Sequence, residues 1–152
     1  ETINGVGYNE YSQLGLGDSL NRNTPTTIST ISGVKQVAAG EYHTVFLMDD
    51  GTVKSVGWNA YKQLGLGHSV DKFIPTTITG ESGVNSIAVG GMQTILLMED
   101  GTVKGFGRNY SGQLGLGDDT DRDTPTIISN LSNVKAIYAG SFSTVILLEE
   151  VD

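Results

Sequence analysis

The acidic stretch Asp119–Asp123 has the spacing of a calcium-binding loop, with aspartates at alternate positions. Such a loop needs a glycine at its sixth position for a sharp turn and a glutamate at its twelfth that binds calcium through both oxygens. The chain has Thr124 and Asn130 at these two positions. Because both requirements fail, we predict a solvated loop rather than a calcium site.

Two histidines, His43 and His68, are the other candidates for catalysis or metal binding, and the chain has no cysteine. Neither histidine has an acid or a nucleophile as an evident partner, and the sequence shows no Ser/His/Asp set and no pair of carboxylates. Two histidines without cysteine also argue against a zinc site. We therefore predict a protein that is not an enzyme, with no catalytic residue, no cofactor and no metal.

The remaining chemistry is that of a protein-binding surface. Aromatic residues, methionine and arginine are enriched at the tightest contacts of protein interfaces, and here they occupy positions that we expect to lie in loops. The alternative is that the rings cap the core between neighbouring structural units, and the sequence leaves both interpretations open. The candidate partner-binding residues are Tyr8, Tyr42, Trp58, Tyr61, Met92, Arg108, Tyr110 and Phe142.

These candidates belong to an internal repeat with a constant offset of 50 residues. Each copy contains the segment Gln-Leu-Gly-Leu-Gly, which begins at Gln13, Gln63 and Gln113. The segment lacks the lysine and the Ser/Thr of a phosphate-binding loop, and no βαβ unit surrounds it, so we interpret it as a turn. Three copies, at about 1–50, 51–100 and 101–150, fill the chain.

Polar residues that recur in every copy are interpreted as structural. An asparagine lies four residues before each of these glutamines, and both side chains can hydrogen-bond loop backbone and hold neighbouring units together. The six positions are Asn9, Gln13, Asn59, Gln63, Asn109 and Gln113. A basic residue also recurs, at Arg22, Lys72 and Arg122, and we expect it to form an ion pair with a neighbouring carboxylate.

Each copy predicts four short strands and no helix, since no segment shows a sustained period of 3.6 residues. In one copy we expect the strands at 26–29, 34–39, 44–48 and 52–56. The apolar run at 44–48 predicts a strand covered on both faces, and Asp49-Asp50-Gly51 predicts a tight hairpin in which glycine supplies a positive φ. Four short antiparallel strands per repeat are typical of a propeller blade, and a solenoid of parallel coils is the alternative.

The predicted fold class is therefore all-β, with propeller blades of four antiparallel strands and three blades per chain. Residues 1–152 form a single partial propeller, in which 1–7 are expected to be a fourth strand that completes another blade, and 125–148 three strands that lack their fourth. Three blades are too few to close a ring. Either two chains join head to tail as a six-bladed dimeric ring with two-fold symmetry, or the sequence is a piece of a longer propeller.

The repeated pattern resembles that of a known family. It reads G-x-N-x-x-x-Q-L-G-L-G-D, then P, then V-x-x-(I/V)-A-x-G, then T-(V/I)-x-L, then D-G-T-V. It is similar to the regulator of chromosome condensation repeat, which forms blades of a β-propeller, and it covers essentially the whole chain. The resemblance implies a packing role for His43. It is less specific for function, because the family includes small-GTPase exchange factors, a plant photoreceptor, a secreted inhibitor of β-lactamases and scaffold proteins.

Net charge and loop length reduce the number of possible functions and partners. The net charge of -8, from 9 basic and 17 acidic residues, disfavours nucleic acid and anionic membranes as partners, and no apolar run is long enough for a membrane helix. We predict a non-catalytic protein–protein interaction scaffold with a protein partner. The alternatives are a fragment of a small-GTPase guanine nucleotide exchange factor, although the equal copies leave no insertion for its wedge, and a secreted inhibitor-type propeller that binds an enzyme through aromatic loop residues.

Overall fold

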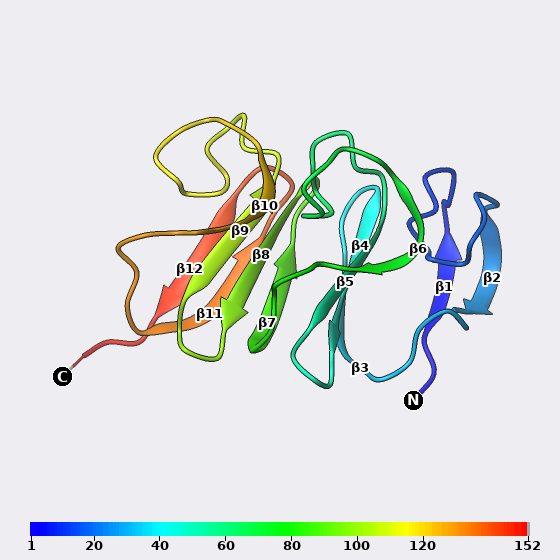
Figure 1. Ribbon diagram of the computed structural model, residues 1–152, viewed down its shortest axis with the longest axis horizontal. Helices are drawn as coiled ribbons and strands as arrows, with labels where there is room; N and C mark the ends of the chain where they lie inside the picture. Colours follow the sequence, from blue (N-terminus) through cyan, green and yellow to red (C-terminus); the bar gives the residue numbers. More distant parts are fainter. Residues whose placement is uncertain (152) are drawn as a thin grey trace.

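The computed structural model describes residues 1–151, and this part of the chain contains twelve β-strands and no helix, hence none that could cross a membrane. The strands are β1 (Asn4–Gly7), β2 (Arg22–Thr27), β3 (Val34–Ala39), β4 (His43–Met48), β5 (Val53–Gly57), β6 (Lys72–Thr77), β7 (Val84–Val89), β8 (Gln93–Met98), β9 (Val103–Gly107), β10 (Arg122–Ile127), β11 (Val134–Ala139) and β12 (Thr144–Leu148). Figure 1 shows them as a row of sheets, with β1 and β2 at one end and β11 and β12 at the other. The predicted all-β fold class is confirmed.

The strands form two complete blades flanked by two half-blades. Each complete blade is an antiparallel sheet of four strands, β3-β4-β5-β6 or β7-β8-β9-β10, and each half-blade is a pair, β1-β2 or β11-β12. The four-stranded antiparallel blade was correctly predicted. The hairpin at Gly51 was also correctly predicted, because Gly51 has a φ of 81° and its N–H donates to the Met48 carbonyl at 3.0 Å.

The predicted grouping of strands was wrong at the strand that contains the repeated proline, which was expected at 26–29 and is β2 at Arg22–Thr27 in the first copy. This strand was expected to begin a new blade, but β2 pairs with β1 and β6 pairs with β5, so it is the outer strand of the preceding blade. A strand that follows a long loop can fold back onto the strand before that loop, and the local pattern does not reveal this choice. Residues 1–27 therefore contribute two strands of one blade, and the last copy contributes two strands, not three, to its own.

Neighbouring sheets pack face to face through alternate residues of their central strands. In β4, all six residues are buried, as predicted for a strand covered on both faces. Val45 and Leu47 pack in a cluster with residues of the next blade such as Leu96, whereas Phe46 packs with Ile28 from the half-blade on the other side. These layers of core join neighbouring blades. The long loops after β1, β5 and β9 project from the same end of the strands (Figure 1).

Candidate protein-binding surface

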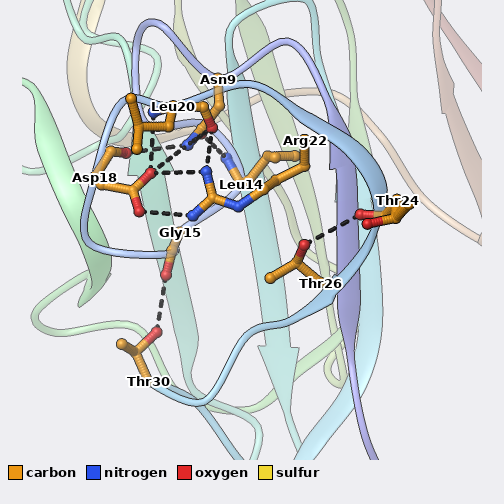
Figure 2. Close-up of polar contacts among 9 residues, drawn as sticks. All are labelled: Asn9, Leu14, Gly15, Asp18, Leu20, Arg22, Thr24, Thr26 and Thr30. Atoms are coloured by element: carbon orange, nitrogen blue, oxygen red, sulfur yellow. Dashed lines mark hydrogen bonds and ion pairs between the residues drawn. The ribbon is translucent and has the colours of Figure 1, made fainter.

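Each of the three long loops is closed by the side chain of one asparagine. In the loop after β1, Nδ2 of Asn9 donates to the main-chain oxygens of Asp18 at 3.0 Å and Leu20 at 3.1 Å, and its Oδ1 accepts from the N–H of Leu14 at 2.9 Å (Figure 2). The asparagines of the other two copies make corresponding bonds. Because all three asparagines are fully buried, the loops start from the same rigid frame in every copy.

An ion pair fixes the far side of the first and third loops. The Arg22 guanidinium binds Asp18 through two contacts, of 2.6 and 3.1 Å, and Arg122 binds Asp118 in the same way, at 2.7 and 3.1 Å (Figure 2 shows the first pair). The expected ion pair is thus confirmed in these two copies. Hydrogen bonding from the arginine, followed by that from backbone N–H groups, holds the pKa of each aspartate below its usual value.

Five aromatic residues form a continuous strip across these loops, which we call the aromatic strip. Tyr8 and Tyr11 come from the loop after β1, Tyr42 from the turn between β3 and β4, and Trp58 and Tyr61 from the loop after β5. The ring centroids of neighbours lie 5.1 to 6.2 Å apart, within the range of favourable aromatic contacts. Trp58 connects the two halves of the strip, because it contacts Tyr11 and Tyr42 on one side and Tyr61 on the other.

The third copy extends the strip with a cation. The guanidinium carbon of Arg108 lies 4.4 Å from the centroid of the Tyr61 ring and 6.0 Å from that of Tyr110. Its Nη1 lies 3.6 Å from the sulfur of Met92. Arg108 occupies the repeat position of Trp58, so the same place on the loop holds a ring in one copy and a guanidinium in the next.

A glycine with a positive φ brings the strip residues together. The N–H of Trp58 donates to the carbonyl of Tyr42 at 2.9 Å, and the preceding Gly57 has a φ of 114°. A Cβ at Gly57 would lie 2.5 Å from that carbonyl oxygen, a distance that side-chain carbons do not tolerate. Glycine is therefore needed here, and it sets the ring of residue 58 beside that of residue 42.

Seven of the eight candidate binding residues lie in or beside this one surface. Phe142 lies apart: it is 60% exposed and lines a shallow pocket with Ser111 and Ile146 at the far end of the molecule. Tyr11 was not among the candidates, although it lies between Tyr8 and Trp58. It could have been found from the sequence, because it occupies the same repeat position as the candidate Tyr61.

The strip is partly exposed and is not part of the core between the blades. Tyr8 is 45% exposed and Tyr110 75%, whereas Tyr11, Tyr42 and Trp58 are half-buried against one another. The aromatic residues in the core clusters are phenylalanines of the strands, and none of the strip residues belongs to these clusters. The rings thus pack mainly on each other and leave one side to solvent.

Charge is distributed unevenly along the strip. Burial, and then the charge of Glu10, raises the pKa of Tyr8, while hydrogen bonding to Glu41 and its charge raise the pKa of Tyr42. Glu10 and Glu41 directly precede Tyr11 and Tyr42 in the chain, so two carboxylates belong to one end of the strip, and Arg108 lies at the other. Both phenols stay protonated at neutral pH and can donate hydrogen bonds.

His43 follows Tyr42 of the strip in the chain and is fully buried. Its Nε2 lies 3.2 Å from Oγ1 of Thr94 in the next blade, and burial lowers its pKa from 6.5 to about 3. At neutral pH His43 is therefore uncharged and connects two blades. Among residues 1–151, no group of three or more His, Cys, Asp or Glu side chains is arranged to hold a metal ion.

Comparison with known families gives a match over nearly the whole chain. A family model described as the Regulator of chromosome condensation (RCC1) repeat matches three times, over residues 5–47, 50–97 and 100–147. A second model with the same description matches residues 34–63. These matches confirm the resemblance seen in the repeated motifs, copy by copy.

Solved structures share this fold. Prp20p from Saccharomyces cerevisiae, studied for its binding to Gsp1p and histones, is 22% identical with a TM-score of 0.86, over 96% of this chain and 39% of that one. Yeast RCC1 (Prp20) bound to Kap60 is 22% identical, with a TM-score of 0.85, over 95% of this chain and 37% of that one. Human WBSCR16 is 28% identical, with a TM-score of 0.79, over 94% of this chain and 39% of that one. The chain thus spans about two-fifths of the length of these proteins.

Proposed function

This chain belongs to the regulator of chromosome condensation repeat family, and we propose that it acts as a non-catalytic scaffold that binds a protein partner through the aromatic strip. The observation that carries the proposal is the contiguity of the strip. Residues chosen because they vary between copies, Tyr8, Tyr42 and Trp58, come from three separate segments, yet their rings are in contact. Side chains that merely decorated separate loops would have no reason to meet.

The strip has the physical properties of a binding surface. Tyrosine and tryptophan offer large, rigid areas that lose little conformational entropy on binding, together with hydrogen-bonding groups. The loops that carry them are closed by buried asparagines, so little ordering remains to be done when a partner binds. The surface is therefore preorganised.

The groups around the strip are suited to binding rather than to catalysis. The phenols of Tyr8 and Tyr42 have raised pKa values, so they are poor nucleophiles and poor bases at neutral pH. Arg108 is held against Tyr61 as a fixed cation. His43, whose imidazole could act as a base, is enclosed between blades and away from solvent.

A selection experiment tests this function. A displayed library of random peptides is selected against the chain, and the enriched peptides are measured against the double variant Tyr11→Ala/Trp58→Ala. We expect binding to fall at least tenfold in that variant and to stay unchanged in Phe73→Ala, which removes an aromatic ring that is 58% exposed outside the strip. Enriched peptides that bind the double variant as tightly as the wild type would refute a role for the strip.

We also propose that the two half-blades join between two copies of the chain. Val45 and Leu47 in β4 are fully buried by the next blade, whereas their repeat equivalents in β12, Val145 and Leu147, are 63% and 44% exposed. In the complete blades, Val45 pairs with Ser55 and Ile95 with Gly105. The same offset would pair Val145 with Gly5 of a second copy, which would add a β1-β2 pair to β11-β12 and place that copy's blade β3-β4-β5-β6 against the apolar face.

The mass of the chain in solution tests this association. We expect light scattering to report twice 16.1 kDa at high concentration and a decrease on dilution. Val145→Lys should stay monomeric and melt at the temperature of the dilute wild type, because the side chain is exposed in the single chain and only association stabilises the wild type further. A wild-type chain that stays at 16.1 kDa at every concentration would refute the proposal.

The exchange-factor alternative rests on fold similarity alone. Prp20p shares the fold at 22% identity, a level at which the likeness does not carry its binding to Gsp1p over to this chain. The long loops of this chain have equal lengths and the same asparagine bonds in all three copies. The aromatic strip therefore remains the surface best supported for binding a partner.

A further inference from the structure

We propose that the partner segment bound by the aromatic strip carries an arginine, whose guanidinium packs on Tyr8 and Tyr42 between the carboxylates of Glu10 and Glu41. This inference rests on the proposed function and specifies the chemistry of its partner. It assigns the acidic end of the strip as the site of recognition. The rest of the strip then holds the apolar parts of the same extended segment.

The chain itself shows how a guanidinium packs on this surface. At the other end of the strip, Arg108 lies over the face of Tyr61, with 4.4 Å between its guanidinium carbon and the ring centroid. Tyrosine faces attract cations because the ring carries a negative quadrupole at its face. Arg108 occupies the repeat position that holds Tyr8 in the first copy and Trp58 in the second. The first copy thus has the rings and lacks the cation.

The acidic end of the strip has the charge that such a cation requires. Glu10 and Glu41 are exposed, and each directly precedes a ring of the strip in the chain, Tyr11 or Tyr42. Their charge also raises the pKa of Tyr8 and of Tyr42. Within residues 1–151, none of the ion pairs involves either carboxylate. The net charge of -8 adds a long-range attraction for a cationic segment.

The ring geometry favours a side chain over a flat ligand such as a sugar chain. The plane of Trp58 is nearly perpendicular to that of Tyr42, at 88°, and to that of Tyr61, at 89°. Tyr8 and Tyr42 also meet edge to face, with centroids 6.2 Å apart, whereas Tyr11 and Trp58 are closer to parallel, at 34°. Rings that alternate in this way present notches rather than a coplanar platform, and a planar guanidinium fits a notch between a ring face and a carboxylate.

Arginine fits this environment better than lysine. A guanidinium can stack on a ring and still donate hydrogen bonds in its own plane to two carboxylates, whereas an ammonium is a compact, strongly hydrated point charge. With an acceptor beside each of the two phenols, the in-plane donors of one arginine could bind both Glu10 and Glu41. We therefore expect discrimination between the two cationic residues and not merely attraction to positive charge.

The single tryptophan of the chain is a built-in reporter for the test, because Trp58 connects the two halves of the strip. Its fluorescence is titrated with three blocked octapeptides of glycine, proline and serine that differ only in two central residues: arginine, lysine or glutamine. We expect a saturable change with the arginine peptide, at least threefold weaker binding of the lysine peptide and at least tenfold weaker binding of the glutamine peptide. Equal affinity for all three would overturn the inference.

Matched variants locate the binding site. Glu10→Gln/Glu41→Gln should weaken binding of the arginine peptide at least tenfold without changing the melting temperature. Glu99→Gln/Glu149→Gln, which changes the same number of exposed carboxylates elsewhere, should have no more than a twofold effect. An equal loss in both double variants would mean that net charge alone attracts the peptide, and it would overturn the assignment of the site.

Two further results separate this inference from the proposed function. If the peptides selected from the random library need Trp58 but show no enrichment of arginine, the strip binds proteins and the inference is wrong. If the library gives no peptide that depends on Trp58, the proposed function fails with it. A saturable fluorescence change with cellohexaose, in the absence of any with the arginine peptide, would overturn the inference in favour of a sugar-binding surface.

Discussion

Neighbouring residues of the same loops and turns perform two different tasks. Trp58 is half-buried in the aromatic strip, whereas Asn59, the next residue, is fully buried and closes the loop. Tyr42 and His43 repeat this contrast, because one ring lies in the strip and the other lies between two blades. In both pairs the surface residue differs in every copy, and Asn59 is the same in every copy.

This difference shows how a repeat can carry a specific surface. The buried asparagine fixes the course of the backbone, so the loop keeps its shape whatever its neighbour is. The neighbour is tyrosine, tryptophan or arginine in the three copies, and the asparagine makes the same bonds beside each of them. Two kinds of variant should therefore behave in opposite ways: changes to the buried residue should affect stability, and changes to the strip should affect binding.

The largest effect on stability is expected for Asn59→Ala. The side chain donates to the carbonyls of His68 at 2.8 Å and Val70 at 3.0 Å and accepts from the N–H of Leu64 at 3.0 Å. Its loss leaves buried backbone groups without partners, which should lower the free energy of unfolding by about 2–4 kcal/mol in urea titrations.

The matched control for this variant is Asn85→Ala, which removes an exposed asparagine of β7 and should change the free energy of unfolding by less than about 0.5 kcal/mol. Equal effects of the two variants would show that the buried asparagine does not support the loop. The contrast between buried and exposed neighbours would then have no energetic basis.

The second prediction concerns His43 and acid. Burial lowers its pKa from 6.5 to about 3, so between these values the unfolded chain binds a proton that the folded chain does not. Stability is thus lost as pH falls, and His43 should account for about 2–3 kcal/mol of the loss between pH 7 and pH 4.5. His43→Gln should remove this part of the pH dependence of urea unfolding.

Glutamine is a reasonable replacement because Gln93 occupies the equivalent position and donates to the carbonyls of Gly140 at 2.9 Å and Ser143 at 3.2 Å. His68→Gln, which removes the other histidine of the chain, is measured as the control. If His43→Gln loses as much stability in acid as the wild type does, then other groups cause the loss, and the buried His43 is not a source of pH sensitivity.

The blade was predictable from the sequence because its signals are local. A continuous apolar run specifies β4, and Gly51 specifies the hairpin that follows it. The side on which β2 pairs was not predictable, because a strand pattern shows that a strand exists but not which neighbour it joins. Only the long-range hydrogen bonds between β1 and β2 settle this point.

The surface was predictable only in part. Variation between copies identified most of the strip, but the separation of Phe142 depends on contacts across the loops. In the first copy Tyr42 meets Tyr11 at 5.1 Å, whereas in the third copy Ser111 stands where Tyr11 does and offers no ring to Phe142. The tyrosine at the next position, Tyr110, is 75% exposed instead.

The third prediction is that Trp58→Ala separates binding from stability. The ring contacts three others in the strip and none of the core clusters, so its loss should cost about 1 kcal/mol of unfolding free energy while binding of strip-dependent peptides falls at least tenfold. Phe73→Ala is the control for binding. A loss of stability as large as that in Asn59→Ala would mean that the ring caps the core, the alternative left open by the sequence.

The smallest effect is expected for Asp118→Asn, which breaks the ion pair with Arg122 at 2.7 Å. The middle copy shows why: it has His68 at the position of Asp118, yet its loop is closed by the same asparagine bonds. Asparagine also keeps an oxygen that can accept from the N–H of Thr120. We expect a melting temperature close to that of the wild type in 0.15 M salt and a small decrease at low salt, where the exposed pair is less screened.

The effect of Asp118→Asn should also depend on pH. Because the pKa of Asp118 is lowered, its contribution to stability is present at pH values above 3.8 and is lost as pH falls below that, so the small difference from the wild type should vanish in acid. A decrease in stability that matches Asn59→Ala would assign closure of the loop to the ion pair, and the buried asparagine would then be only one of two supports.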